Sequence, residues 1–402
     1  MNRVVLTGLG VVSSIGTGAG DFTASLRSGR SGASPITAFD TEGFVHRNGC
    51  EVRGFVAGDW IRTVDADQLG RASRFSVAAA RMAVDDAGLS SSDLRGKHGL
   101  ISVGTTDGEA YELDTLAVAE LAGTTMAGAE AQRTLPGRLA TEIARELGLS
   151  DVETETIGTA CAAGNYAIGD GFDAVRLGEA DFALCGGADA ICRKTFAGFY
   201  RLGTIAPEVC QPFDADRQGI LTGEGAGILI LEPLDAALAR GARIYAEVLG
   251  YGLNCDARHP VAPDRDSVAR CIELALADAG IRPGEVDLIS AHGTGTKLND
   301  VTEAQAIRQV YGAEPPPTVS LKSMLGHAMG AASAIATAAC ALAITHGFIP
   351  PTINHVRTDP ECGIDCVPNR SVEAELDIVQ NTGLAFGGNN AVVILGKYRA
   401  DR

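Results

Sequence analysis

The stretch Thr156-Ile-Gly-Thr-Ala-Cys161-Ala-Ala-Gly-Asn165 decides how the rest of the chain is interpreted. The residues before it, 152–157, have Val, Thr and Ile spaced as in a β-strand. The residues after it, 166–177, carry apolar side chains at helical spacing. The sequence therefore predicts that Cys161 lies in a tight turn that leads from a strand into the first turn of a helix.

Such a turn suits a reactive thiol. Free backbone N–H groups and the helix dipole favour a thiolate at the start of a helix, and the small neighbours of Cys161 leave room for a substrate. A lone cysteine in an apolar setting is more often a buried, inert thiol. The turn makes the two interpretations about equal, and both stay open at this point.

Length and charge restrict the possible classes of protein. The chain has 402 residues, of which 46% are hydrophobic. That length predicts two domains or one large composite fold. The formal net charge of -17 argues against nucleic acid or an anionic membrane surface as a partner.

The cysteines and the apolar segments indicate a cytoplasmic protein. Ten cysteines are scattered without a paired framework, which is typical of reduced thiols. The first residues lead straight into a strand pattern and show no targeting signal. The apolar run 331–351 is rich in small residues and ends in two prolines, so we expect a buried helix there and no membrane span.

The second part of the chain repeats the patterns of the first in the same order. The paired segments are 4–10 with 245–252, 86–89 with 278–281, 100–102 with 288–290, 161–165 with 323–327, and 227–231 with 391–395. Five matches in register indicate two related halves, 1–242 and 243–402, that share one core. Strands that alternate with helices predict an α/β fold with a mainly parallel, covered sheet in each half. Gly8, Gly10 and Gly16 are expected to mark turns after the first strand.

Two histidines of the second half follow strand-like runs. His292 lies in Ala291-His-Gly-Thr-Gly-Thr296, and His327 ends Lys322-Ser-Met-Leu-Gly-His327 at a predicted helix start. If the halves pack about a pseudo-two-fold axis, the turns of Cys161 and His327 face each other and both histidines approach the thiol. A lone histidine is more often structural, but this pair opposite a cysteine turn favours catalysis.

Three charged residues, Lys322, Asp300 and Glu303, lie near the two histidines in the sequence. Lys322 sits in an apolar segment, and a partly buried lysine needs a carboxylate partner, for which Glu303 is the natural candidate. The alternative for Lys322 is a solvated loop lysine. Asp300 and Glu303 begin a helix, so helix capping is the alternative for both carboxylates.

Other motifs carry weaker signals. Phe386-Gly-Gly-Asn-Asn390 precedes the last strand and suits close backbone approach to a ligand, although a plain tight turn explains it equally. No cysteine or histidine pair has the spacing of a zinc site, so no metal is expected. The glycines after the first strand break the dinucleotide-binding fingerprint at its third position.

Taken together, the motifs resemble those of the β-ketoacyl-acyl-carrier-protein synthases of the elongating type, within the thiolase-like superfamily. The resemblance covers essentially the whole chain. Its motifs are Thr159-Ala-Cys161, Pro212-Phe-Asp-Ala-Asp-Arg-Gln-Gly219, Gly223-Glu-Gly-Ala-Gly227, the two histidine motifs, Pro350-Pro-Thr-Ile-Asn354 and Phe386-Gly-Gly-Asn-Asn390. It implies a five-layered αβαβα fold of two duplicated halves, a dimer, and no cofactor.

The resemblance also implies roles for residues. Cys161 would accept the acyl group, His292 and His327 would promote decarboxylation of a malonyl thioester, and Lys322 with Glu303 would support them. The backbone N–H groups of Cys161 and Phe386 would form the oxyanion hole, and Phe386 would gate the pocket. The sequence departs from the usual Phe-Gly-Phe-Gly-Gly at Leu384-Ala-Phe-Gly-Gly388.

The implied reaction is a Claisen condensation with malonyl-carrier protein, in type II polyketide or polyene biosynthesis. Housekeeping fatty-acid elongation is one alternative, and a non-catalytic scaffold subunit is another. An acyl carrier protein is the expected partner, and Arg71 and Arg74 are candidates for a basic contact patch, with ordinary surface arginines as the alternative. The second subunit of the dimer is either an identical chain or a related ketosynthase-like chain.

Overall fold

A computed structural model describes residues 1–124 and 128–400. The first part of the chain contains β1 (Val4–Ser13), β2 (Gly16–Thr17), α1 (Ala19–Ser28), β3 (Ser34–Pro35), β4 (Asn48–Gly49), α2 (Arg71–Asp86), α3 (Ser91–Leu94), β5 (Gly99–Gly104), α4 (Ala110–Leu121), α5 (Gly128–Ala131), α6 (Arg138–Leu147), β6 (Val152–Ile157), α7 (Ala163–Leu177), β7 (Phe182–Asp189), α8 (Arg193–Arg201), β8 (Gly225–Pro233) and α9 (Leu234–Ala239).

The second part contains β9 (Ala246–Cys255), α10 (Arg265–Ala279), β10 (Leu288–Ser290), α11 (Lys297–Tyr311), β11 (Thr318–Val319), α12 (Lys322–Leu325), α13 (Ala331–His346), β12 (Phe348–Ile349), β13 (Val372–Glu373), β14 (Ile378–Leu384) and β15 (Asn389–Gly396). The apolar run that the sequence assigns to a buried helix is α13. None of the described helices is long and apolar enough to cross a membrane.

Most of the described strands form one large mixed sheet in which the duplication is visible, and the pairs β3–β4 and β12–β13 form two small separate sheets. The order of the large sheet is β11-β10-β14-β15-β9-β1-β8-β7-β5-β6, with β2 paired to β1. On the β1 side of the central β1–β9 pair, β8 and β7 are antiparallel additions and β5 and β6 parallel ones. The β9 side repeats this with β15, β14, β10 and β11. This repeat confirms the predicted α/β fold of two duplicated halves. The expectation of a mainly parallel sheet in each half is wrong, because both halves share one sheet and the strands nearest its centre pair antiparallel. The boundary at 242/243 stays a prediction.

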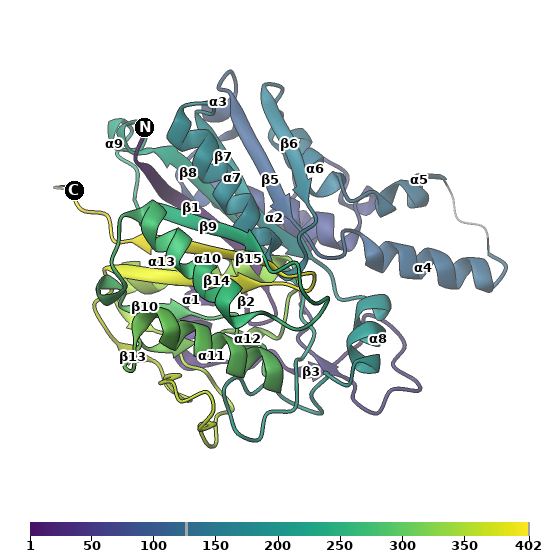
Figure 1. Cartoon of the computed structure of the whole chain (residues 1–402). Helices are drawn as coiled ribbons and strands as arrows, with labels where there is room; N and C mark the ends of the chain where they lie inside the picture. Colours follow the sequence, from purple (N-terminus) through teal and green to yellow (C-terminus); the bar gives the residue numbers. More distant parts are fainter. Residues whose placement is uncertain (125–127, 401–402) are drawn as a thin grey trace.

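Three apolar cores lie between the layers. Helices α2 and α6 cover the outer face of the first strands, and α10 and α11 pack on the second part of the chain. Helices α7 and α13 pack against each other and against strands of both halves, and the largest core surrounds them. The αβαβα layering follows from these contacts, and Figure 1 shows α7 and α13 among the strands.

Gly8 and Gly10, two of the three glycines predicted as turn markers, lie inside β1, so the expectation is wrong for these two; Gly16 directly follows the turn between β1 and β2. A Cβ atom at Gly8 would meet the carbonyl oxygen of Ala83 at 2.2 Å, and one at Gly10 would meet that of Ala79 at 1.9 Å. Both glycines therefore allow α2 to approach the strand closely. In β9, Gly250 and Gly252 permit the same approach of α10.

Candidate active site

The Cys161 turn has the predicted form. The chain leaves β6, makes a short 3-10 turn at Ala160–Ala162 and enters α7 at Ala163. Ala160, directly before the thiol, has a φ of 50°, a backbone conformation that costs free energy for a residue other than glycine. The N–H of Gly164, in the first turn of α7, donates to the carbonyl of Gly330 at 3.1 Å, which fixes this turn to the start of α13.

Burial governs the protonation of Cys161. The side chain is 5% exposed, and this burial raises the pKa of the thiol to about 12. The charge of Lys322 and the backbone N–H of Phe386 act in the opposite direction, whereas Asp189 and Asp107 raise the thiol pKa further. Burial therefore acts against the thiolate that the helix start is expected to favour.

His292 lies in the loop that follows β10. Its backbone N–H donates to Glu303 Oε1 at 2.7 Å, and the next N–H, of Gly293, donates to Glu303 Oε2 at 2.8 Å. Glu303 comes from α11 and is buried, which raises its pKa to about 7. The carboxylate thus fixes the backbone that carries His292.

Lys322 contacts His292 and does not form the predicted direct ion pair with Glu303. Its Nζ donates to the carbonyl oxygen of His292 and lies 3.4 Å from Nδ1 of the same residue. Glu303 uses its oxygens on backbone N–H groups, and its charge reaches Lys322 only through space, where it raises the lysine pKa against the larger effect of burial. A lysine that donates to Nδ1 leaves the proton of the neutral imidazole on Nε2.

His327 lies in the turn between α12 and α13. Its backbone N–H donates to the carbonyl of Leu221 at 2.6 Å, and its carbonyl accepts from Gly223 at 2.8 Å, so the turn is anchored to a segment of the first half. The ring centroids of His292 and His327 are 5.4 Å apart. Burial and the charge of Lys322 hold both histidine pKa values well below their usual range, so both rings are neutral.

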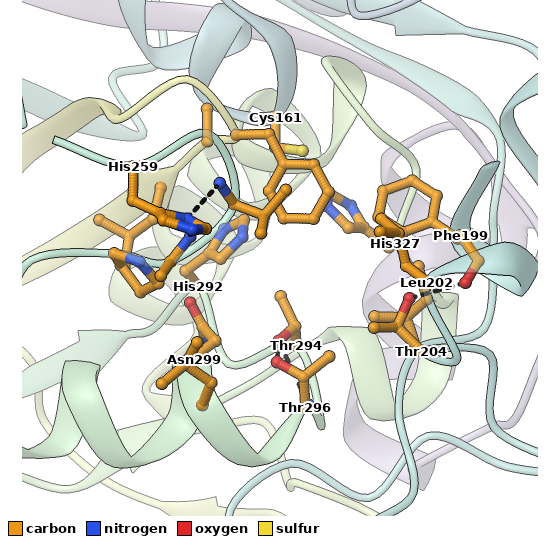
Figure 2. A pocket seen from close by; sticks show the side chains of 18 residues that line it. Cys161, Phe199, Leu202, Thr204, His259, His292, Thr294, Thr296, Asn299 and His327 are labelled. Atoms are coloured by element: carbon orange, nitrogen blue, oxygen red, sulfur yellow. Dashed lines mark hydrogen bonds between the residues drawn. The ribbon is translucent and has the colours of Figure 1, made fainter. Parts of the chain in front are cut away.

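A cavity of about 180 Å³ brings these groups together. Figure 2 shows Cys161, His292 and His327 around it, with Asn299, Thr294 and Thr296 on the opposite wall. The other lining residues are Phe199, Leu202, Thr204, Ile220, His259, Val261, Ala262, Pro263, Leu298, Leu384, Ala385 and Phe386. Cys161, from one half, therefore shares a pocket with both histidines, from the other.

Phe386 stands at the edge of the pocket. Its side chain is 38% exposed, and its ring lies 5.4 Å from that of Phe199. The following loop is tied to another one, because Gly387 N–H donates to the carbonyl of Pro260 at 2.8 Å. This position suits the predicted gate, and the gate and the oxyanion hole remain predictions.

Asp300 organises the loops beside the pocket. It lies within α11, whose N-cap is Thr296, and its carboxylate accepts from the N–H of Phe213 at 2.8 Å and of Gly295 at 3.2 Å. Arg217 Nε lies 3.4 Å from its Oδ2. The residue therefore supports the His292 loop through the backbone and does not cap the helix.

The candidate contact patch of Arg71 and Arg74 is not a pair of free cations. Arg71, the first residue of α2, forms an ion pair at 2.5 Å with Glu224, whose side chain is fully buried. Its charge is therefore used inside the chain. Arg74 donates to the carbonyl of Ala66 at 2.8 Å and lies 3.9 Å from Asp67. Arg71 is accordingly the weaker member of the predicted patch.

The acidic segment 104–109 also has internal partners. Asp107 pairs with Lys194 at 2.6 Å, and Glu109 accepts from the N–H of Ser73 at 2.8 Å near the start of α2. Its acidic side chains therefore have structural partners within the chain. Within the described residues, no group of three or more His, Cys, Asp or Glu side chains has the arrangement of a metal site.

The fold and the pocket define a class of acyl-transferring enzyme in which a buried thiol at a helix start faces two neutral histidines. The comparisons with known proteins agree. Residues 1–237 match the family described as beta-ketoacyl synthase, N-terminal domain, and residues 245–356 match its C-terminal domain. The chain belongs to the beta-ketoacyl synthase family, whose members form carbon–carbon bonds by acyl transfer.

Curated relatives cover the whole chain. A 3-oxoacyl-[acyl-carrier-protein] synthase 2 of Synechocystis sp. is 39% identical, and the match covers 99% of this chain and 98% of the relative. Nodulation protein E of Rhizobium sp. is 38% identical, with coverage of 97% and 98%.

Solved structures share both the fold and much of the sequence. A structure titled "The ishigamide ketosynthase/chain length factor" has a TM-score of 0.98 and 63% identity, over 99% of this chain and 100% of that one. A type II PKS ketosynthase, titled as bound to the hexaketide and in complex with its acyl-carrier protein, has a TM-score of 0.90 and 32% identity, again over 99% and 100%.

Several residues that line the pocket are not predicted by the sequence motifs. Thr294 and Thr296 stand in the His292 motif, and Asn299 follows it, so the spacing from a predicted catalytic histidine was the signal that could have found them. Phe199 and His259 lie in segments that carry no motif. Only the folded chain brings them to the pocket.

Proposed function

We propose that the chain catalyses decarboxylative condensation of a malonyl-carrier thioester with an acyl group held on Cys161, giving a β-ketoacyl-carrier thioester. The observation that carries the proposal is the shared pocket, in which a thiol of one half meets two neutral imidazoles of the other. A non-catalytic scaffold would need none of these groups in one cavity.

In the first half-reaction, the sulfur of Cys161 attacks the carbonyl carbon of an acyl-carrier thioester. The bond from that carbon to the carrier sulfur breaks, and the thiol proton leaves with the carrier sulfur. Because burial raises the thiol pKa, loss of the proton is coupled to the attack. The N–H groups of Cys161 and Phe386 would hold the developing oxyanion.

In the second half-reaction, the malonyl carboxylate leaves as CO₂, and the electron pair moves to the α-carbon and the thioester oxygen. Neutral His292 and His327 suit this step, since an imidazole N–H donates to a developing enolate oxygen. Lys322, at Nδ1 of His292, directs that residue's Nε2–H toward the pocket. The carbanion then attacks the acyl carbon, the bond to Cys161 breaks, and the sulfur regains a proton.

Intact-protein mass spectrometry tests the catalytic role. After incubation with acyl-carrier thioesters of graded chain length, the chain is expected to gain one acyl mass that maps to Cys161. Cys161→Ala is expected to gain none, whereas Cys255→Ala, which removes an exposed thiol, gains the same mass as the unchanged chain. Absence of an adduct with every donor would favour the scaffold.

The carrier partner is an acyl carrier protein in this proposal. A relative in structural comparison is titled as a ketosynthase in complex with its acyl-carrier protein. Arg74 remains a candidate contact. Charge reversal in Arg74→Glu is expected to raise the KM for the carrier at low salt; an unchanged KM would remove this contact from the proposal.

Polyketide or polyene assembly is the proposed pathway, supported by the 63% identity to a ketosynthase/chain length factor structure. The names of the curated relatives favour fatty-acid elongation as the second candidate. Chain-length profiles of the products separate them: retained β-keto or polyene intermediates support the first, and efficient elongation of saturated acyl chains supports the second. The ten free thiols suit the reducing cytoplasm, which is the proposed location.

A further inference from the structure

Four buried polar side chains form a hydrogen-bonded group, here called the polar cluster, beside the largest apolar core. They are Asn165 of α7, Ser333 and Thr337 of α13, and Asn381 of β14, and each residue is at most 4% exposed. The core in which α7 and α13 pack is otherwise made of apolar side chains. Polar groups in such surroundings cost free energy unless they are hydrogen-bonded, and these four bond largely to one another.

The two asparagines of the polar cluster join several elements. Asn381 Nδ2 donates to Asn165 Oδ1 at 3.0 Å and to Thr337 Oγ1 at 2.8 Å. Asn165 Nδ2 donates to the carbonyl oxygens of Asn381 and Ala391, both at 3.2 Å. The backbone N–H of Asn165 donates to Ser333 Oγ at 3.0 Å. Helix α7 is thus bonded to α13, β14 and β15 through one residue, Asn165.

Both asparagines are close in sequence to a group at the thiol. Asn165 lies about one helical turn after Cys161, at the start of α7. Asn381 belongs to β14, which ends two residues before Phe386. The backbone N–H of Phe386 lowers the pKa of the Cys161 thiol and so is directed at it. The bonds between the asparagines therefore link the helix that follows the nucleophile to the strand that leads to the second predicted oxyanion donor.

The backbones approach one another closely at the same place. A Cβ atom at Gly164 would lie 2.8 Å from the backbone nitrogen of Ala334 in α13, and one at Gly383 would lie 3.2 Å from Cα of Ala162. These contacts bring α7, α13 and β14 together but do not fix how far one slides along another, because apolar packing is not directional. Hydrogen bonds have a preferred direction and length, so the polar cluster can fix that alignment.

Stability alone does not explain the polar cluster. Asn381 Oδ1 is buried and has no hydrogen-bond partner within the part of the chain that the structure describes. An unpaired buried acceptor costs free energy, and a half-satisfied buried network is less stable than well-packed apolar side chains. What the network adds is a single arrangement of the elements that it joins.

We propose that Asn165 and Asn381 are positioning residues that align the Cys161 turn with Phe386 and so set the geometry of acyl transfer to the thiol. This inference deepens the proposed catalytic function and rests on it. Neither asparagine lines the pocket, so both act through the backbone N–H groups of Cys161 and Phe386. A small displacement of either N–H weakens its bond to the developing oxyanion.

Decarboxylation is expected to depend less on the polar cluster. The loop of His292 is held by Glu303, and the backbone of His327 is bonded to Leu221 and Gly223. These anchors contain no member of the polar cluster. The proposal therefore separates a loss of acyl transfer from a loss of decarboxylation.

Two reactions of Cys161 in the full chain test the proposal. Acylation by an acyl-carrier thioester needs the oxyanion donors, whereas alkylation by iodoacetamide does not. In Asn165→Leu, the single-turnover acylation rate at saturating donor is expected to fall by about tenfold or more. The half-saturating donor concentration, the alkylation rate and the rate of CO₂ release from malonyl-carrier thioester are each expected to change by less than about threefold.

Thr337 supplies a milder pair of variants in case Asn165→Leu does not fold. Thr337→Val removes the hydroxyl at nearly constant shape and is expected to lower acylation relative to alkylation, and Thr337→Ser keeps the hydroxyl and is expected to restore the ratio. The matched control is Ser76→Ala, which removes another buried hydroxyl, bonded to the carbonyl of Leu139 at 2.8 Å between α2 and α6. It is expected to leave the ratio unchanged.

The possible failures can be told apart. Circular dichroism shows which variants fold. If the unchanged chain is acylated but its ratio of acylation to alkylation is the same in the folded Asn165 and Thr337 variants, the positioning proposal is overturned and the catalytic one stands. An equal fall of the ratio in Ser76→Ala would also overturn it. If no donor acylates the unchanged chain, the catalytic proposal fails and the positioning role fails with it.

Discussion

The two halves of the sheet have the same strand order, but the connection that precedes the central helix is short before α7 and longer before α13. In the first half, residues 158–162 connect β6 to α7 and carry Cys161. In the second, residues 320–330 connect β11 to α13, and the added length forms α12, which carries Lys322 and positions His327. The short turn of the first half thus presents one nucleophile, whereas the longer connection of the second half supplies a charge and a proton donor to the same pocket.

The largest loss of activity is expected when the proton donors of the second half, His292 and His327, are removed. His292→Ala and His327→Ala are each expected to lower the condensation rate by about 100-fold or more, the range for loss of one preorganised donor, while acylation of Cys161 is retained. A single-turnover assay with preloaded acyl-enzyme measures this. The control, His346→Ala, removes an exposed histidine. An equal loss of condensation rate in the control, or loss of Cys161 acylation in the two variants, would contradict the assignment of acylation to the first half and decarboxylation to the second.

Lys322 contributes to keeping the two histidines neutral. Its charge lowers the pKa of His292 and of His327, so Lys322→Met raises both values. Because the neutral donor is lost as pH falls through the histidine pKa, the acid limb of the condensation rate is expected to move to higher pH. Lys322→Arg keeps the charge and is expected to leave the limb close to its original position. An unmoved limb in the methionine variant would disprove the electrostatic role.

Asp189 is the charged residue through which the pKa of Cys161, in the first half, can be tested. It is buried, accepts from the N–H of Gly330 at 2.6 Å, and its charge raises the pKa of Cys161. Asp189→Asn is expected to lower that pKa, so alkylation of Cys161 by iodoacetamide becomes a few-fold faster at pH 8 to 9, since thiolate is the reactive form. Asp21→Asn, at an exposed position, serves as the control. A slower or unchanged alkylation would refute this assignment.

In both halves, a helix packs closely against a strand at glycine positions, and substitutions there are expected to change stability by a small amount. Gly10→Ala and Gly252→Ala each place a methyl group against backbone atoms of a helix, so we expect each to reduce the free energy of unfolding by about 1–3 kcal/mol. Gly58→Ala, where a Cβ meets nothing within 4 Å, is expected to change little. Chemical denaturation measures all three, and stability losses confined to one half would count against equivalent packing.

Patterns within short stretches of sequence predict single strands and turns of the fold. The strand at 152–157 and the Cys161 turn were found because alternation and small residues are visible in sequence. The glycines of β1 were misread as turns, since glycine marks a turn and a close helix contact equally well. At the start of helix α2, Glu109 accepts the N–H groups of Ala72 and Ser73, a contact that only the folded chain makes.

The site was predictable as a set of residues and less so as a set of contacts. The repeat gave a reason for Cys161 and His327 to converge. It did not reveal that Lys322 bonds to His292 while Glu303 holds the backbone of that loop. The raised pKa of Cys161 was also missed, because burial depends on residues far away in sequence.

Release of CO₂ from malonyl-carrier thioester tests most directly whether the halves divide the work. Cys161→Ala is expected to release CO₂ without forming a condensation product, because the histidines that stabilise the enolate remain. The double variant His292→Ala/His327→Ala is expected to form acyl-Cys161 but to release almost no CO₂. If Cys161→Ala loses decarboxylation as completely as the double variant, the thiol and the histidines do not act separately, and the account is wrong.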